Sequence, residues 1–341
     1  MADLAFFSQL KPTPLSNEMP SSTKVLFIDP TEPILWERLS ADGYECVDLL
    51  QADEATVFDH LPSAFGVVIR SRFKVDRRFL DQGAQLQFVA RSGVGTEHIR
   101  LDYAAQRGIK VFTSPEGSRD TVGEHTLGLL LMLMNNLARA DRQVRNGEWV
   151  RAGNRGYEIK GKTVGIIGYG NMGQAFAKRL QGFGCRVVAY DKYKTNYGDV
   201  YAEAVSLTDL QEQADILSLH IPYEEDNHHL VNKDYLQGFH KPIWIVNTAR
   251  GLVIKTDDLV EALESGKVRG AALDVIEYED QSFVHLDPKL QPPAFQALLD
   301  MPNVVLNPHI AGWSYEAEEG HARTLADKIT TTFPAPKLAN Q

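Results

Sequence analysis

The sequence has few cysteines, no long apolar run and no dense basic segment, and each absence excludes a class of protein. Only two cysteines, Cys46 and Cys185, occur among 341 residues, which fits a reducing compartment and predicts a cytoplasmic location. The longest apolar run, Leu127–Met134, is far shorter than the roughly 20 residues that a membrane span needs. Because the net charge is -10 and no Lys/Arg block occurs, neither nucleic acid nor a membrane is an expected partner.

The beginning of the chain also lacks the features of a targeting signal. Residues 1–22 have no basic start and no continuous apolar core, and they contain Pro12, Pro14 and Pro20. We therefore expect these residues to be an N-terminal extension. The remainder is long enough for two domains, since single cores stop growing at roughly 250–300 residues.

Two successive series of strand-like and helix-like segments follow. Such alternation favours parallel sheets with helices on both faces. In the first series, the predicted strands are Lys24–Asp29, Tyr44–Leu50, Phe65–Ser71, Leu86–Gly93 and Ile109–Ser114. In the second, they are Thr163–Gly168, Arg186–Asp191, Ile216–Ile221, Ile243–Asn247, Ala271–Val275 and Val304–Asn307. The predicted fold class is α/β, with two doubly wound parallel-sheet domains.

Two longer helices are predicted outside these alternating units. The segment Thr121–Glu124 fits a capping box, which predicts a helix that runs through the apolar stretch to Arg145. The following Asn146-Gly147 pair ends it. A second helix over Ser314–Phe333 is too short to form a domain and must dock on one of the two.

A glycine-rich string stands in the setting of a dinucleotide site. Gly168, Gly170 and Gly173 form GxGxxG between a predicted strand and a helix, and the next strand ends at Asp191. The glycines allow a tight turn, approach of the pyrophosphate and close helix–strand packing, while the helix N-terminus offers free N–H groups. A carboxylate at Asp191 can accept hydrogen bonds from the adenosine ribose and disfavours the 2′-phosphate of NADP. The sequence therefore predicts NAD as the cofactor, with two nearby lysines weakening the preference.

Three side chains in the second half suit acid–base chemistry on a carboxylic acid. Arg250 can bind a carboxylate through two parallel hydrogen bonds, and His309 can act as a general acid or base near neutral pH. Glu279 can orient an imidazole. Each residue follows a predicted strand, where open α/β sheets place their ligands. Taken singly, each also suits a structural or solvated role, and their spacing alone does not prove that they converge.

The motifs of the second half resemble those of the D-isomer-specific 2-hydroxyacid dehydrogenases. The similarity extends from Lys24 to about Phe333 and includes, after the glycine string, SLHIP (Ser218–Pro222), NTARG (Asn247–Gly251), AALDV with Glu279, and NPHIAG (Asn307–Gly312). The resemblance implies that Arg250 binds the substrate, His309 is the acid/base and Glu279 is its partner. It implies cofactor contacts from Gly168, Gly170, Asn171, Met172, Gly173, Asp191, His220, Pro222, Thr248, Ala249, Arg250, Asp274 and Gly312.

The resemblance also implies an architecture. We expect a flavodoxin-like substrate-binding domain made of residues 23–118 and 313–341, and a Rossmann NAD-binding domain made of residues 119–312. We further expect a homodimer that forms through the long helix, and no metal site.

The first half contains two segments that fall where this family holds its substrate, and the implied substrate residues there are Arg70, Ser71, Val94 and Gly95. Arg250 of the second half completes this set. The string Arg70-Ser71-Arg72 is similar to that of the D-3-phosphoglycerate dehydrogenases, and further cations at Arg72 and Lys74 would suit a phosphate. Departures from the family's pattern, such as Glu97-His98 where Asp-Asn is frequent, put the substrate's identity in doubt.

Three functions therefore stay open. The chain resembles a dehydrogenase of a small D-2-hydroxy acid, with 3-phosphoglycerate as one candidate substrate. A glyoxylate or hydroxypyruvate reductase would use the same three residues. A non-catalytic, corepressor-like NAD sensor would need only the dinucleotide site, and the presence of all three acid–base residues argues against it.

Overall fold

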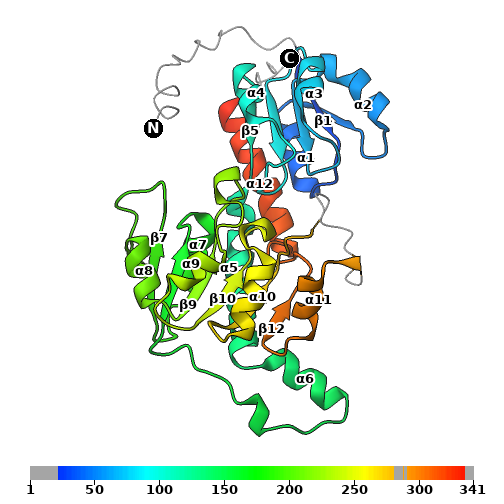
Figure 1. Ribbon diagram of the computed structural model, residues 1–341. Coiled ribbons are helices and arrows are strands. Elements are labelled where there is room, and N and C mark those ends of the chain that lie inside the picture. Colours follow the sequence, from blue (N-terminus) through cyan, green and yellow to red (C-terminus); the bar gives the residue numbers. More distant parts are fainter. Residues whose placement is uncertain (1–21, 280–286, 288–289, 335–341) are drawn as a thin grey trace.

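The computed structural model describes residues 22–279, 287 and 290–334, and these residues form two sheets (Figure 1). The first sheet has the strand order β2-β1-β3-β4-β5, and the second has the order β12-β11-β10-β9-β6-β7-β8. All pairings between these strands are parallel. The first order is flavodoxin-like, and the second contains the Rossmann order, so the predicted fold class is confirmed. The predicted N-terminal extension lies, apart from Ser22, outside the described residues.

The strands agree closely with the predicted segments. The first sheet contains β1 (Lys24–Phe27), β2 (Glu45–Asp48), β3 (Gly66–Ile69), β4 (Phe88–Arg91) and β5 (Lys110–Phe112). The second contains β6 (Thr163–Ile167), β7 (Arg186–Tyr190), β8 (Glu203–Ala204), β9 (Ile216–Leu219), β10 (Ile243–Asn247), β11 (Val268–Leu273) and β12 (Val304–Leu306). The prediction lacks β8 because two exposed residues carry no periodic pattern.

Helices cover both faces of each sheet. Those of the first part are α1 (Pro33–Ala41), α2 (Glu54–His60), α3 (Arg77–Gln82), α4 (Leu101–Gln106), α5 (Pro115–Met134) and α6 (Leu137–Arg145). The second part adds α7 (Asn171–Arg179), α8 (Leu207–Gln213), α9 (Lys233–Gln237), α10 (Thr256–Glu264), α11 (Pro293–Asp300) and α12 (Tyr315–Thr332). None of these helices, within the described part of the chain, is long and apolar enough to cross a membrane.

The long central helix differs from its prediction at both ends. Helix α5 begins at Pro115, whose fixed φ and missing N–H suit the first helical turn, so the predicted capping box at Thr121 is wrong. Thr121 lies inside the helix, and its hydroxyl contacts the Ser314 hydroxyl at 2.9 Å. The predicted continuous run to Arg145 is broken because Asn136 adopts a left-handed φ of 56°, and α6 starts anew after it.

The C-terminal helix packs on the first sheet. Strands β1, β3 and β4 form a buried cluster with apolar residues of α12, which include Ala322, Leu325, Ala326 and Ile329. Near the start of α12, its backbone meets that of α5, since a Cβ atom on Gly117 would lie 2.4 Å from the His321 nitrogen. The chain thus leaves the first sheet through α5 and returns to it through α12, side by side (Figure 1).

Candidate active site

The glycine string forms a cradle between β6 and α7. Gly168 has a φ of +89°, and a Cβ atom on Gly173 would lie 2.2 Å from the Gly168 carbonyl oxygen. By contrast, no atom lies within 4 Å of a Cβ placed on Gly170, so the space there is open. No side chain caps α7, which leaves its first N–H groups directed at this space. The cradle fits the pyrophosphate of a dinucleotide.

Two further predicted cofactor residues border the cradle. The Asp191 carboxylate accepts hydrogen bonds from the backbone nitrogens of Tyr169 (3.0 Å) and Tyr193 (3.0 Å), which ties the end of β7 to the glycine loop. The His220 ring lies 5.5 Å from the ring of Phe176 on α7. Burial lowers the pKa of His220 to about 3, so its imidazole is neutral at physiological pH.

All predicted residues of the NAD site and of the acid–base group follow strands of the second sheet. Gly168 follows β6, Asp191 follows β7, and His220 and Pro222 follow β9. Thr248, Ala249 and Arg250 follow β10, Asp274 follows β11, and His309 and Gly312 follow β12, while Asn171 and Met172 open α7. Since these strands are parallel, their carboxyl ends meet at one edge of the sheet, with β6 and β9 at the topological switch point.

A buried asparagine shapes the loop that carries Arg250. Asn247, which is fully buried, accepts a hydrogen bond from the Ala249 nitrogen and donates one to the Arg250 carbonyl oxygen, both at 3.0 Å. Arg250 in turn donates from one terminal nitrogen to the Ala249 carbonyl oxygen at 2.7 Å. Asn247 begins the NTARG string, but no role was predicted for its side chain, although a buried polar residue at a strand end is a typical loop anchor.

A buried aspartate shapes the loop that carries His309 in the same way. The Asp274 carboxylate accepts hydrogen bonds from the nitrogens of Ile310 (2.9 Å) and Ala311 (2.7 Å). Burial raises the pKa of Asp274, but these bonds and the neighbouring His125 outweigh it and lower the pKa overall, which keeps the group charged. His309 itself has a left-handed φ of 56°, a conformation that few residues adopt and that often marks functional sites.

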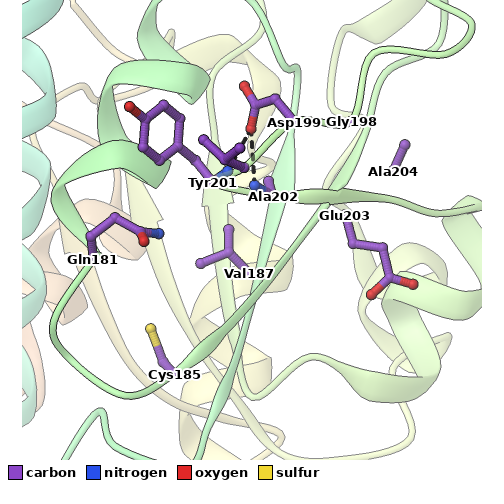
Figure 2. Close-up of a pocket in the computed structure, with 10 residues that line it drawn as sticks. Gln181, Cys185, Val187, Gly198, Asp199, Tyr201, Ala202, Glu203 and Ala204 are labelled. Atoms are coloured by element: carbon purple, nitrogen blue, oxygen red, sulfur yellow. Dashed lines mark hydrogen bonds between the residues drawn. The ribbon is translucent and has the colours of Figure 1, made fainter.

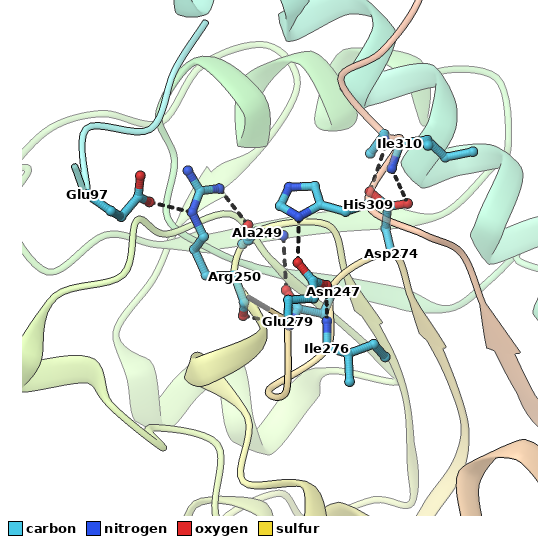
Figure 3. A network of polar contacts seen from close by, with 10 residues as sticks. Glu97, Asn247, Ala249, Arg250, Asp274, Ile276, Glu279, His309 and Ile310 are labelled. Atoms are coloured by element: carbon cyan, nitrogen blue, oxygen red, sulfur yellow. Dashed lines mark hydrogen bonds and ion pairs between the residues drawn. The ribbon is translucent and has the colours of Figure 1, made fainter. Parts of the chain in front are cut away.

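Figure 3 shows that Arg250, Glu279 and His309 come together at this edge. His309 Nδ1 lies 2.7 Å from Glu279 Oε2, and the other carboxylate oxygen of Glu279 accepts a hydrogen bond from the Ile276 nitrogen. Glu279 is therefore fixed at both oxygens and orients the imidazole. The Arg250 side chain lies next to the ring (Figure 3). The sequence could not establish this proximity, because the three residues come from different strands.

The first sheet contributes an acidic partner that the sequence analysis noted only as a departure from the family. Glu97, in the loop after β4, accepts a hydrogen bond from Arg250 Nε at 2.6 Å (Figure 3). Burial raises the pKa of Glu97, but the charge and hydrogen bond of Arg250 dominate and lower it overall. Predicted substrate residue Gly95 adjoins this pair, since a Cβ atom there would lie 2.5 Å from an Arg250 terminal nitrogen. Val94, beside it, is exposed.

The Arg70-Ser71-Arg72 segment wraps around a single carboxylate. Asp29 Oδ2 accepts hydrogen bonds from the backbone nitrogens of all three residues, at 2.6, 3.0 and 3.2 Å. The Arg72 guanidinium donates to the carbonyl oxygens of Ile28, Leu49, Leu50 and Ala52. Arg72 is thus a structural residue that ties loops together, and not a phosphate ligand. The Arg70 side chain instead pairs with Glu318 of α12 at 3.2 Å.

Arg91, at the end of β4, is a further cation near the site and was not among the predicted site residues. Burial lowers its pKa to about 10, Glu97 raises it, and the charges of Arg250 and Arg70 lower it. Arg91 therefore lies within electrostatic reach of both other arginines. Its buried Nε has no hydrogen-bond partner among the described residues. The only signal in the sequence was its place directly before the glycine loop.

The hollow drawn in Figure 2 is a separate feature. Gln181, Cys185, Val187 and Gly198–Ala204 line it, at the β7 and β8 side of the second sheet. It contains none of the predicted site residues. In the described part of the chain, no group of three or more His, Cys, Asp or Glu side chains could hold a metal ion.

Comparisons with known proteins identify the family. Residues 127–311 match the model of the D-isomer specific 2-hydroxyacid dehydrogenase, NAD binding domain. The chain is 36% identical over 272 residues to a hydroxypyruvate reductase of Thermotoga maritima, covering 79% of this chain and 85% of that protein. It is 34% identical over 276 residues to a D-3-phosphoglycerate dehydrogenase of Methanocaldococcus jannaschii, covering 80% of this chain but only 50% of that protein.

Solved structures agree. A D-lactate dehydrogenase from Aquifex aeolicus, complexed with NAD and lactic acid, superimposes with a TM-score of 0.74 at 25% identity, covering 91% of this chain and 95% of that one. The glycine cradle, the parallel sheets and the matched family model therefore point to one conclusion. The chain belongs to the D-isomer specific 2-hydroxyacid dehydrogenases and is an NAD-dependent oxidoreductase.

Proposed function

We propose that the protein interconverts small D-2-hydroxy acids and 2-oxo acids, with Arg250, Glu279 and His309 as the acting residues. The observation that supports this most directly is the Glu279–His309 pair at 2.7 Å beside Arg250, at the sheet edge that also carries the glycine cradle. Such a cluster supplies a carboxylate-binding cation and an oriented acid–base group in one place.

Each residue has a distinct role in this proposal. Arg250 binds the substrate carboxylate and polarises the carbonyl oxygen. Glu279 holds His309 through Nδ1, and Nε2, on the opposite edge of the ring, donates a proton to the carbonyl oxygen on reduction or removes it on oxidation. When bound, NAD supplies the hydride chemistry at its nicotinamide ring. Its contacts are proposed to come from the glycine cradle, Asp191, His220, Pro222, Thr248, Ala249, Asp274 and Gly312, with Asn171 and Met172.

The substrate is proposed to be a short, monoanionic acid of the hydroxypyruvate or glyoxylate type. Two cations that would suit a phosphate are already engaged, since Arg72 binds backbone carbonyls and Arg70 pairs with Glu318. The similarity to a hydroxypyruvate reductase over most of both chains agrees with this substrate class.

A phosphorylated acid such as 3-phosphoglycerate is the second candidate. Its support is the half-buried Arg91, whose charge interacts with those of Arg70 and Arg250. A non-catalytic NAD sensor is the third, and the fixed Glu279–His309 pair, which NAD binding alone does not require, disfavours it.

A substrate panel tests the proposal. NADH oxidation should be followed with hydroxypyruvate, glyoxylate, pyruvate and phosphohydroxypyruvate, and NAD reduction with D-glycerate and 3-phosphoglycerate. We expect the highest kcat/KM with a monoanionic 2-oxo acid. Absence of turnover with every acid, together with intact NADH binding, would favour the sensor.

We further propose the domain boundaries given above, a cytoplasmic location and a homodimer. Helix α6 and the segment after it project from the body of the molecule (Figure 1). This projection exposes large apolar side chains, namely Leu137, Val144, Trp149, Val150 and Tyr157. A second copy of the chain would cover them. Sedimentation analysis should therefore give twice the chain mass, and Trp149→Ser should shift it towards the monomer.

A further inference from the structure

Arg70 and Arg91 lie at the carboxyl ends of the neighbouring strands β3 and β4, where Ile69 pairs with Arg91. The charge of Arg91 interacts with those of both Arg70 and Arg250. Arg250 and Arg70 each have a glutamate partner, Glu97 and Glu318 respectively. If Arg250 holds the substrate carboxylate, the group at the other end of a longer substrate extends past Arg91 towards Arg70.

The two arginine–glutamate pairs differ in geometry. Glu97 engages Arg250 through Nε, at the stem side of the guanidinium. Glu318 Oε1 lies 3.2 Å from Nη1 of Arg70, which is at the outer end of the guanidinium where an anionic ligand would bind. The pairing thus leaves Arg250 suited to a carboxylate and places a fixed negative charge in front of Arg70.

A second donor holds Glu318 in this position. Trp313 Nε1 donates a hydrogen bond to the same Oε1 atom at 3.0 Å. Trp313 stands two residues before α12, and the Ser314 side chain caps this helix by accepting from the Ala317 nitrogen at 3.1 Å. Glu318 lies in the first turn, so its carboxylate is anchored at the helix end and by the indole.

A phosphate or second carboxylate at Arg70 would have to displace or face this glutamate. Two like charges about 4 Å apart repel each other strongly at intermediate dielectric constants, and solvent reduces this repulsion for partly exposed groups. The Glu318 side chain is 30% exposed and that of Arg70 is 40% exposed, so a substantial part of the repulsion is retained. A short acid with an uncharged side chain avoids it.

We propose that Glu318 is a specificity-determining residue that selects monoanionic 2-oxo and D-2-hydroxy acids and excludes those with a second anionic group. The inference rests on the proposed function, since it assumes that Arg250 holds the substrate carboxylate. To the proposed function it adds that the substrates carry a single negative charge and that Glu318 determines this preference.

Binding in the presence of NAD tests the proposal without requiring turnover. The ratio of the dissociation constants of 3-phosphoglycerate and D-glycerate is measured by calorimetry for the wild type and for Glu318→Gln. This change removes the charge but keeps the side chain's size and an oxygen that can accept from Trp313. We expect 3-phosphoglycerate to gain at least about tenfold relative to D-glycerate. Adding Arg70→Gln to this variant should abolish the gain.

Glu319→Gln is the matched control, because Glu319 is the next residue of α12 but pairs outward with Arg323. It should leave the ratio unchanged. An unchanged ratio in Glu318→Gln, or an equal gain in Glu319→Gln, overturns the proposal. NADH affinity shows whether Glu318→Gln is folded. If it is not, Glu318→Ala provides the same comparison. Failure of every acid to turn over in the wild type counts instead against the proposed function.

Discussion

The two halves of this chain share an architecture but present their ligand sites by different means. The second sheet offers NAD a backbone surface, made of open space at Gly170 and the N–H groups of α7. The first sheet is proposed to meet the acid with charged side chains, several of which are already paired, as Arg70 is with Glu318. A site built from backbone follows from a local motif, whereas a site built from charge pairs depends on contacts between distant segments.

The largest expected effect comes from His309, which follows a strand of the second sheet and is proposed to act on the acid. His309→Ala should lower kcat by about 10²–10⁴, since the proton transfer loses its acid–base group. NADH affinity should change little, because the backbone cradle is intact. Steady-state kinetics and fluorescence titration with NADH separate the two effects. Wild-type turnover in this variant would show that the role of His309 is wrong.

Gly173→Ala should weaken NADH binding without affecting the binding of the acid. Its Cβ atom would meet the Gly168 carbonyl oxygen at 2.2 Å, so the glycine loop must shift away from the pyrophosphate. We expect the Kd for NADH to rise at least about tenfold. Gly128→Ala is the control, because a Cβ on this α5 glycine meets no atom within 4 Å. Equal NADH affinity in Gly173→Ala and the control would refute the fit of the cradle.

Gly95→Ala should have the opposite effect, because it should weaken binding of the acid without affecting NADH binding. The new methyl group would press on the Arg250 guanidinium and on Glu97. We expect the KM for the 2-oxo acid to rise by roughly tenfold, while NADH affinity stays at the wild-type value. If the affinity for NADH falls as much as the affinity for the acid, the NAD site and the acid site do not respond independently to substitution.

The smallest effect concerns stability and the buried His220. Its pKa falls from 6.5 to about 3 on folding, so the unfolded chain binds the extra proton between these pH values. The free energy of unfolding should therefore decrease as the pH falls through this window, by up to about 1.4 kcal/mol per pH unit from this group. His220→Asn should flatten the pH dependence measured by denaturant unfolding. The same substitution at the exposed His240 should leave this pH dependence unchanged.

The sequence predicted most of the fold because apolar alternation and glycine spacing are local signals. It failed at the start of α5, where Pro115 begins the helix and the Thr121 hydroxyl is used for a contact with Ser314. It also left Arg72 open as a phosphate ligand, since carbonyl oxygens 20 to 44 residues away cannot be assigned from a pattern. The Glu97–Arg250 pair could not be predicted either, because its two residues are 153 positions apart in the sequence.

The left-handed backbone of His309 limits which residues this position can accommodate. Asparagine and aspartate adopt such a conformation several-fold more readily than most residues, whereas β-branched side chains are strongly disfavoured. Alanine here incurs a backbone cost of about 1 kcal/mol that asparagine largely avoids. His309→Asn is therefore the better choice of inactive enzyme for trapping an acid and NAD together in a crystal, because it removes the imidazole while preserving the loop that Asp274 organises.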